Sequence, residues 1–100
     1  MRRAARVDSN LKEIAAAFRQ MGCSVHVENG MVDLKVGYGG QTALVEVKRP
    51  GKVRYTPAQI KFRETWTGGI RLVQTLDDVE STVRTLRSWH AAIVAASLKP

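Results

Sequence analysis

Residues 29–48 read Asn29-Gly-Met-Val-Asp33-Leu-Lys-Val-Gly37-Tyr-Gly-Gly40-Gln-Thr-Ala-Leu-Val-Glu46-Val-Lys48, and this stretch decides the fold. Its two halves, 29–37 and 41–48, contain the β-branched residues that strands favour. The turn between them, 37–40, holds three glycines and is typical of an antiparallel hairpin. A phosphate-binding glycine loop would instead lead from a strand into a helix, and this one leads into a second strand-like run.

Apolar and charged side chains alternate along both halves. Because side chains of a strand point to opposite faces in turn, Asp33 lies on the face opposite to Leu34. For the same reason Glu46 and Lys48 lie opposite to Val47. A hairpin therefore brings one carboxylate from each strand, and a lysine, to one patch. Such a patch can hold a hard divalent cation beside a phosphate and orient a water molecule.

Length and charge limit the function classes. A chain of 100 residues, 44% of them hydrophobic, is expected to form a single domain. Its net charge of +7 favours a polyanionic partner, and nucleic acid is the leading candidate. A membrane surface is the alternative, but no basic amphipathic helix, lipid anchor, signal peptide or membrane-spanning run is evident. Cys23 is the only cysteine, so we expect a buried thiol in a soluble, cytoplasmic protein.

A helix and a strand are predicted before the hairpin. Asp8 or Ser9 can cap a helix whose apolar residues recur at helical spacing until Gly22. Glu13 lies on the flank of this apolar face, from which it can reach the edge of a sheet. Residues 24–28 alternate between valine and polar residues and predict the first strand.

A basic loop and a second helix are predicted after the hairpin. The loop carries Arg49, Lys52 and Arg54, and a flexible basic loop beside a metal centre suits contact with a nucleic-acid backbone. Tyr55 follows it and can either stack on a base or pack against the protein. Thr56-Pro57 is a helix start, with threonine as the cap and proline at the first position.

The chain is expected to end with a strand and a long helix. The second helix stops at Gly68-Gly69, and residues 70–75 predict the last strand. Asp77 or Asp78 is expected to cap the final helix. The distal part of that helix, 89–98, is more apolar than a lone surface helix requires, so it either packs under the domain or forms a dimer seam.

The motif in the hairpin resembles the PD-(D/E)XK nuclease superfamily. An aspartate, a gap that crosses a hairpin and then Glu-x-Lys are present here as Asp33 and Glu46-Val47-Lys48. The family usually has proline where this chain has Val32.

Flanking segments make the chain similar to the compact virus-type replication-repair nuclease (VRR-Nuc) branch found among phage proteins. They are Asp8-Ser-Asn-Leu-Lys-Glu13-Ile14, Thr56-Pro-Ala-Gln59 and Trp66-Thr-Gly-Gly69, and the likeness covers roughly 7–83. The resemblance implies a restriction-endonuclease-like α/β core, in which a central mixed sheet of about four strands is flanked by helices. Residues 1–100 would form one such domain, with its final helix at about 77–98.

Five catalytic residues are implied by this resemblance: Asp33, Glu46, Lys48, Gln59 and Glu13. Magnesium or manganese would be bound by Asp33, Glu46, the backbone carbonyl of Val47 and Glu13. Lys48 would hold or activate the attacking water, and Gln59 would orient the lysine or the scissile phosphate. Simpler interpretations are a cross-strand ion pair for the hairpin residues, a solvated glutamate at position 13 and a surface amide at position 59.

The resulting hypothesis is a metal-dependent DNA endonuclease that selects branched or flapped DNA by shape. The predicted DNA contacts are Arg49, Lys52, Arg54, Tyr55 and Lys61. A homodimer would give so small a protein a larger surface for gripping a duplex or junction. The alternatives are a non-catalytic nucleic-acid-binding module and a protein-interaction domain. Zinc chemistry and Ser-His-Asp catalysis find no support in the spacing of histidines, cysteine and serines.

Overall fold

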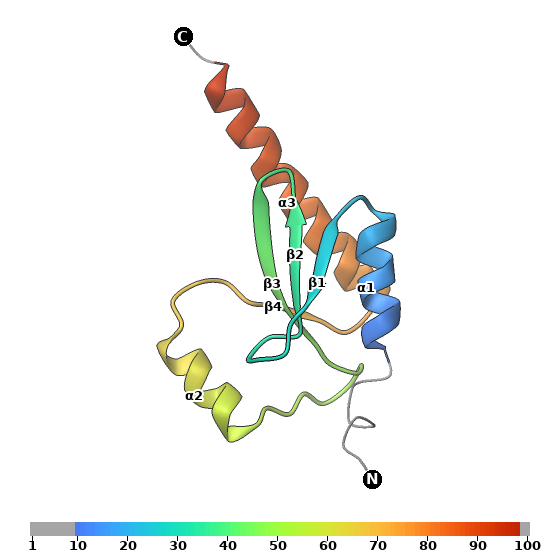
Figure 1. Ribbon diagram of the computed structural model, residues 1–100, viewed down its shortest axis with the longest axis vertical. Helices are drawn as coiled ribbons and strands as arrows, with labels where there is room; N and C mark the ends of the chain where they lie inside the picture. The colour runs from blue at the N-terminus through green and yellow to red at the C-terminus, as the bar shows by residue number, and fades with distance from the viewer. Residues whose placement is uncertain (1–9, 99–100) are drawn as a thin grey trace.

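A computed structural model describes residues 10–98, which form three helices and four strands (Figure 1). In chain order these are α1 (Leu11–Gln20), β1 (Ser24–Val27), β2 (Leu34–Tyr38), β3 (Gln41–Val47), α2 (Pro57–Thr65), β4 (Arg71–Val73) and α3 (Leu76–Ser97).

The described strands form one mixed sheet with the order β1-β2-β3-β4. β2 runs antiparallel to both β1 and β3, whereas β4 runs parallel to β3. In the hairpin, Leu34 pairs with Val45 and Tyr38 pairs with Gln41. The predicted α/β fold, with a mixed sheet of about four strands flanked by helices, is confirmed.

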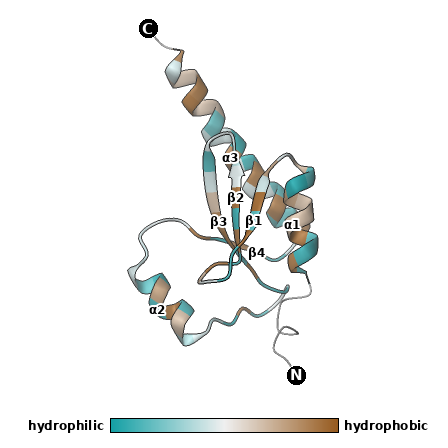
Figure 2. Cartoon of the chain, in the orientation of Figure 1, coloured by the Kyte–Doolittle hydropathy of each residue, from teal (hydrophilic) through white to brown (hydrophobic). Residues whose placement is uncertain are grey.

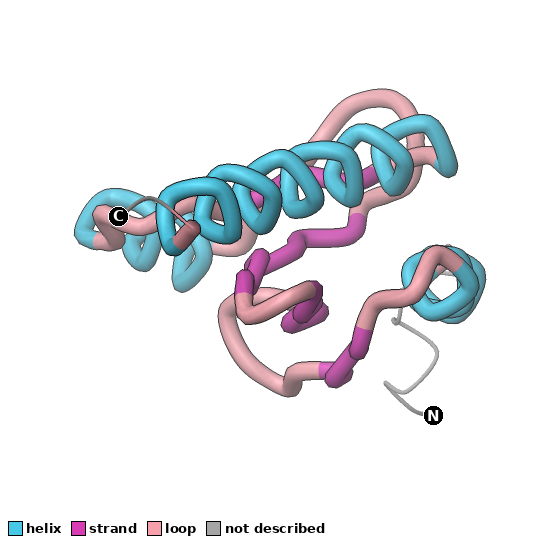
Figure 3. Tube along the Cα trace, turned by 90° about the horizontal axis from the view of Figure 1, so that it is seen from above, coloured by secondary structure: helices cyan, strands magenta, loops and turns pink. Residues whose placement is uncertain are grey.

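Two of the helices cover one face of the sheet. α3 contacts β2, β3 and β4, and α1 contacts β1 and α3 (Figure 3). The hydrophobic core lies between this helical layer and the sheet. It comprises the buried residues Ile14, Ala15, Phe18, Cys23, Leu34, Val36, Ala43, Val45, Val47, Val73, Val79, Val83 and Leu86. The alternation in the sequence therefore correctly predicted the buried face of the hairpin.

α2 lies apart from this helical layer, beyond the edge of the sheet (Figure 1). Its residues are all described, and none of them is buried. Thr56 caps α2 as predicted, with Pro57 at its first position. The helix ends at Thr65 rather than at the predicted Gly68-Gly69, because Trp66 adopts an extended backbone and its ring stacks on Phe62.

The hairpin turn is shorter than predicted. Gly37 and Tyr38 belong to β2, so only Gly39 and Gly40 form the turn. Both have positive φ, 55° and 82°, which glycine adopts without steric cost and which a two-residue hairpin turn requires. His90 of α3 packs over the turn, where its Nδ1 lies 2.9 Å from the carbonyl oxygen of Gly39.

The N-terminal caps also depart from the prediction. Asn10 precedes α1, and the predicted caps Asp8 and Ser9 lie outside the described residues. α3 is capped by Thr75 rather than by Asp77 or Asp78. Thr75 accepts a hydrogen bond from the backbone N–H of Asp78, whose carboxylate in return accepts one from the N–H of Thr75. Asp78 is therefore the reciprocal partner of the cap.

The distal part of α3 extends past the sheet (Figure 1). Apolar residues continue along it, as the hydropathy colouring in Figure 2 shows. Trp89, Ile93, Val94 and Leu98 are all exposed, with 54% of Ile93 accessible. No helix within residues 10–98 is long and apolar enough to span a membrane.

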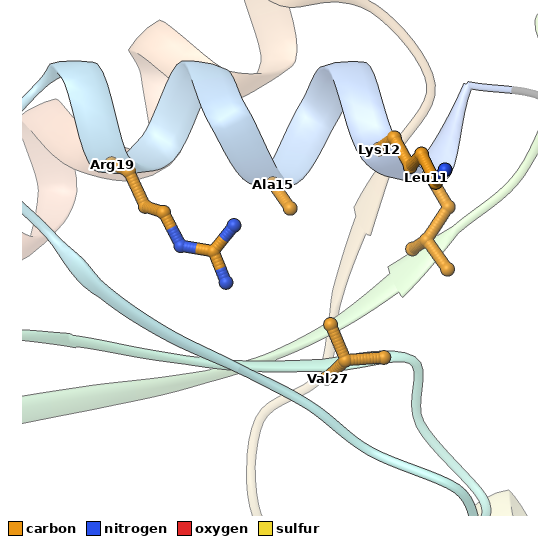
Figure 4. A pocket seen from close by; sticks show the side chains of 5 residues that line it. All are labelled: Leu11, Lys12, Ala15, Arg19 and Val27. Carbon is orange, nitrogen blue, oxygen red and sulfur yellow. The ribbon is translucent and has the colours of Figure 1, made fainter.

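A groove of about 590 Å³ lies between α1 and β1 (Figure 4). Its lining residues are Leu11, Lys12, Ala15, Arg19 and Val27. Ala15 belongs to the core, and Val27 pairs with the core residue Leu34 and so shares its face of the sheet. The groove is therefore separate from the charged patch of the hairpin, which faces the other way.

Candidate active site

Glu46 is the centre of the charged patch. It lies in β3 between Val45 and Val47, both of which point into the core, so its own side chain points to the opposite face. Only 2% of Glu46 is exposed. A buried carboxylate requires hydrogen-bonding partners, and Glu46 has two. Lys48 Nζ lies 3.3 Å from Oε2, and Gln59 Nε2 donates to the same oxygen over 2.9 Å.

The charge state of Glu46 is shaped by these surroundings. Burial raises the pKa of the Glu46 carboxyl above its usual value, and the neighbouring Asp33 carboxylate raises it further. Lys48 and Gln59 act in the opposite direction, because both stabilise the ionised form. Two carboxyl groups that repel each other in a partly dry site are characteristic of a place where a cation can bind.

Asp33 is held beside Glu46 by the backbone of β3. Its Oδ2 accepts a hydrogen bond of 2.8 Å from the N–H of Val47. Its own N–H donates to the carbonyl of Val45 over 3.0 Å, and its carbonyl accepts from the N–H of Glu28. Asp33 precedes β2, yet these three bonds tie it to β3 and to Glu28.

Gln59 connects the site to α2. Its Oε1 accepts a hydrogen bond from the N–H of Thr56 over 3.0 Å, and its N–H donates to Thr56 Oγ1 over 3.1 Å. The amide oxygen is thus engaged by the start of the helix, which leaves the NH₂ group for Glu46. The same side chain therefore caps α2 and joins it to the sheet.

Lys48 follows β3 directly, and its backbone is anchored on both sides. Its N–H donates to the carbonyl of Val73, and its carbonyl accepts a hydrogen bond of 3.2 Å from Asn10 Nδ2. Its side chain is 20% exposed. Besides the contact with Glu46, the ammonium lies 5.3 Å from the centre of the Tyr55 ring.

The remaining residues predicted for the site lie on the surface. Glu13 is an exposed residue of α1. Within residues 10–98, no three histidine, cysteine, aspartate or glutamate side chains are grouped so as to hold a metal ion, so Glu13 does not join Asp33 and Glu46 in such a group. The predicted DNA contacts are exposed, apart from the half-buried Tyr55: Arg49, Lys52, Arg54 and Lys61.

Arg63 is a residue of this region that the sequence analysis did not identify. Its guanidinium lies 4.3 Å from the centre of the Tyr55 ring. Arg63 follows Gln59 by four residues, so both lie on the same face of α2. That spacing was the available signal, and it becomes informative only once Gln59 is known to face the sheet.

The available oxygen atoms suit a hard cation. Among the described residues, the hydrogen bonds to Asp33 and Glu46 use one oxygen of each carboxylate and leave Asp33 Oδ1 and Glu46 Oε1 unbonded. Magnesium and manganese prefer carboxylate and carbonyl oxygens, which these two residues and the Val47 carbonyl supply. The donor set is therefore chemically suited to such an ion.

Comparisons of the chain with protein-family models, with curated proteins and with solved structures return no match.

Proposed function

We propose that this protein is a metal-dependent DNA nuclease of the PD-(D/E)XK type, similar to the VRR-Nuc branch, which acts in the cytoplasm. The observation that carries the proposal is the environment of Glu46. It is a buried carboxylate with Lys48 and Gln59 on one oxygen and Asp33 close enough to raise its pKa. An ordinary surface ion pair would not bury its acid beside a second carboxylate.

Each residue has a distinct role in this proposal. Asp33, Glu46 and the backbone carbonyl of Val47 would hold magnesium or manganese. When bound, the ion neutralises phosphate charge and supplies an activated water. Lys48 would hold that water and offset the charge that develops on the phosphate. Gln59 keeps the Glu46 carboxylate in one orientation through its hydrogen bond to Oε2.

The DNA backbone is the proposed partner of the basic surface. Arg49, Lys52, Arg54 and Lys61 are exposed in the loop that follows β3 and in α2, close in sequence to the carboxylate site. Such contacts position a duplex without reading its bases, which is consistent with selection of branched or flapped DNA by shape.

Cleavage assays with paired variants test the proposal. Supercoiled plasmid and branched DNA are incubated with magnesium or manganese and with the wild type, Asp33→Ala, Lys48→Ala or the control Lys12→Ala, which removes an exposed lysine on the far side of the sheet. We expect cleavage by the wild type and the control, and at least about a hundredfold slower cleavage by the other two. Equal rates in all four proteins would refute the assignment.

A non-catalytic nucleic-acid-binding module is the second candidate. It is favoured by the finding that Asp33 and Glu46 lack a third acidic, histidine or cysteine partner in the part of the chain described. In this case Glu46 and Lys48 would serve only as an ion pair that holds α2. Salt-dependent DNA binding without cleavage in either metal would select this candidate.

A second copy of the chain is the proposed partner of the distal part of α3. Trp89, Ile93 and Val94 are exposed, and none of them belongs to the hydrophobic core of the described residues. Pairing two such helices would bury these side chains and place two sites on one DNA molecule. Sedimentation velocity should show a dimer for the wild type and for Ser88→Glu, but a monomer for Ile93→Glu. A monomeric wild type would reject the dimer.

A further inference from the structure

We infer that Tyr55, supported by Arg63, is a positioning residue that holds the Lys48 ammonium against Glu46. This inference rests on the proposed function, because it assigns the way in which the lysine of that site is aligned. It gives Tyr55 a role within the site instead of the predicted contact with DNA.

The need for positioning arises from the lysine side chain. An ammonium on a four-carbon stem has many rotamers, and its three donors rotate freely. Among the described residues, only two charged or aromatic groups contact the Lys48 ammonium: Glu46 Oε2 at 3.3 Å and the Tyr55 ring at 5.3 Å. The carboxylate attracts the ammonium, but the ring restricts the directions from which it can approach.

The Tyr55 ring is itself held in place. It is half-buried, and the Arg63 guanidinium lies 4.3 Å from its centre. Arg63 Nη2 is buried and has no hydrogen-bond partner among the described residues. An unbonded buried donor is unfavourable, so stacking on the Tyr55 ring is the described contact that stabilises this guanidinium.

Residues of α2 therefore orient both members of the Glu46–Lys48 ion pair. Gln59 holds the carboxylate of Glu46, and Arg63, one turn later, supports the ring that restrains Lys48. Alignment of a reacting group within a site changes the rate of the chemical step more than the binding of substrate. Loss of the ring should therefore affect turnover, with little effect on DNA affinity.

Two substitutions at position 55 separate the ring from the hydroxyl group. In the full chain, Tyr55→Leu should lower kcat about tenfold or more and leave KM within about twofold. Tyr55→Phe keeps the aromatic face and should remain within about twofold of the wild type. Arg63→Met, which leaves the ring unsupported, should lower kcat severalfold. This variant carries the test if Tyr55→Leu fails to fold, as judged by circular dichroism.

A spectroscopic measurement follows the lysine without relying on activity. The ε-methylene signal of Lys48, identified by its loss in Lys48→Arg, should show an upfield ring-current shift in the carbon-proton NMR spectrum. The shift should persist in Tyr55→Phe, disappear in Tyr55→Leu and weaken in Arg63→Met.

The outcomes distinguish the two proposals. An inactive wild type that shows the shift would reject the nuclease and retain the positioning role. An active wild type whose Tyr55→Leu and Arg63→Met variants turn over at the wild-type rate would overturn the positioning role and retain the nuclease. Equal damage from Tyr55→Phe and Tyr55→Leu would also overturn it, because the aromatic face would then not be the operative group.

Discussion

α3 and α2 are attached to the same sheet by different means. α3 buries Val79, Val83 and Leu86 against the strands. α2, all of which is described, buries no residue and is joined to the sheet through the Gln59 side chain. Apolar burial is non-directional and stabilises the whole domain, whereas a hydrogen bond fixes one geometry. The position of α2 relative to the sheet is therefore set by the polar groups of the candidate site rather than by the hydrophobic core.

The largest expected effect on stability comes from a substitution in the hydrophobic core between the sheet and the helices α1 and α3. Phe18 of α1 is fully buried, so Phe18→Ala should lower the free energy of unfolding by about 3–5 kcal/mol. Ile60→Ala in α2 removes a side chain that is 48% exposed and should cost no more than about 0.5 kcal/mol. Urea unfolding followed by circular dichroism measures both. A similar loss in the two variants would show that α2 packs like the other helices.

A smaller and local effect is expected when the polar attachment of α2 is removed. Gln59→Ala removes the side-chain hydrogen bonds to the N–H of Thr56 and to Glu46, and it should destabilise α2 locally by about 1–2 kcal/mol. Amide hydrogen exchange should then accelerate roughly tenfold in residues 60–65 and remain unchanged around Leu86. Thr56→Ser, which keeps the capping hydroxyl, is the control. Unaltered exchange in α2 would mean that something other than Gln59 holds the helix.

The smallest expected effect has the opposite sign and concerns Glu46. Because its pKa is raised on folding, its contribution to stability is present below the usual glutamate pKa and is lost as the pH rises through the raised value. Glu46→Gln removes the charge and should stabilise the protein by about 1 kcal/mol at pH 7, with the advantage disappearing below about pH 4.

Unfolding midpoints in urea between pH 4 and pH 8 measure this difference. The exposed Glu13 provides the control, and Glu13→Gln should change the midpoint very little at any pH. If Glu46→Gln were less stable than the wild type at pH 7, the contacts with Lys48 and Gln59 would outweigh the cost of burying the charge. Under the proposed function, the stabilised variant should not cleave DNA.

Much of the fold could be predicted because its signals are local. The alternation of residues 29–48 correctly identified the hairpin and the buried face that includes Leu34 and Val45. Thr56-Pro57 correctly marked the start of α2. The errors lie at ends of elements. The turn is limited to Gly39 and Gly40, a choice that depends on strand register rather than on the number of glycines.

The candidate site was predictable to a lesser extent. Strand alternation places Asp33 and Glu46 on one patch, and the structure brings them together with Lys48 and Gln59. Strand alternation placed Glu46 on the face opposite to the core and did not indicate that its side chain would be buried. Glu13 lies on the surface of α1, and the stack of Tyr55 and Arg63 was not foreseen.

By itself, the sequence determined which side chains share a face and where the helices and strands form, because those properties follow from backbone periodicity over a few residues. Only the tertiary structure decided that a glutamine 13 positions further along the chain would meet Glu46 and that a tyrosine would lie beside Lys48. Such contacts depend on where a loop returns to the sheet, and the packing of the whole chain sets that path.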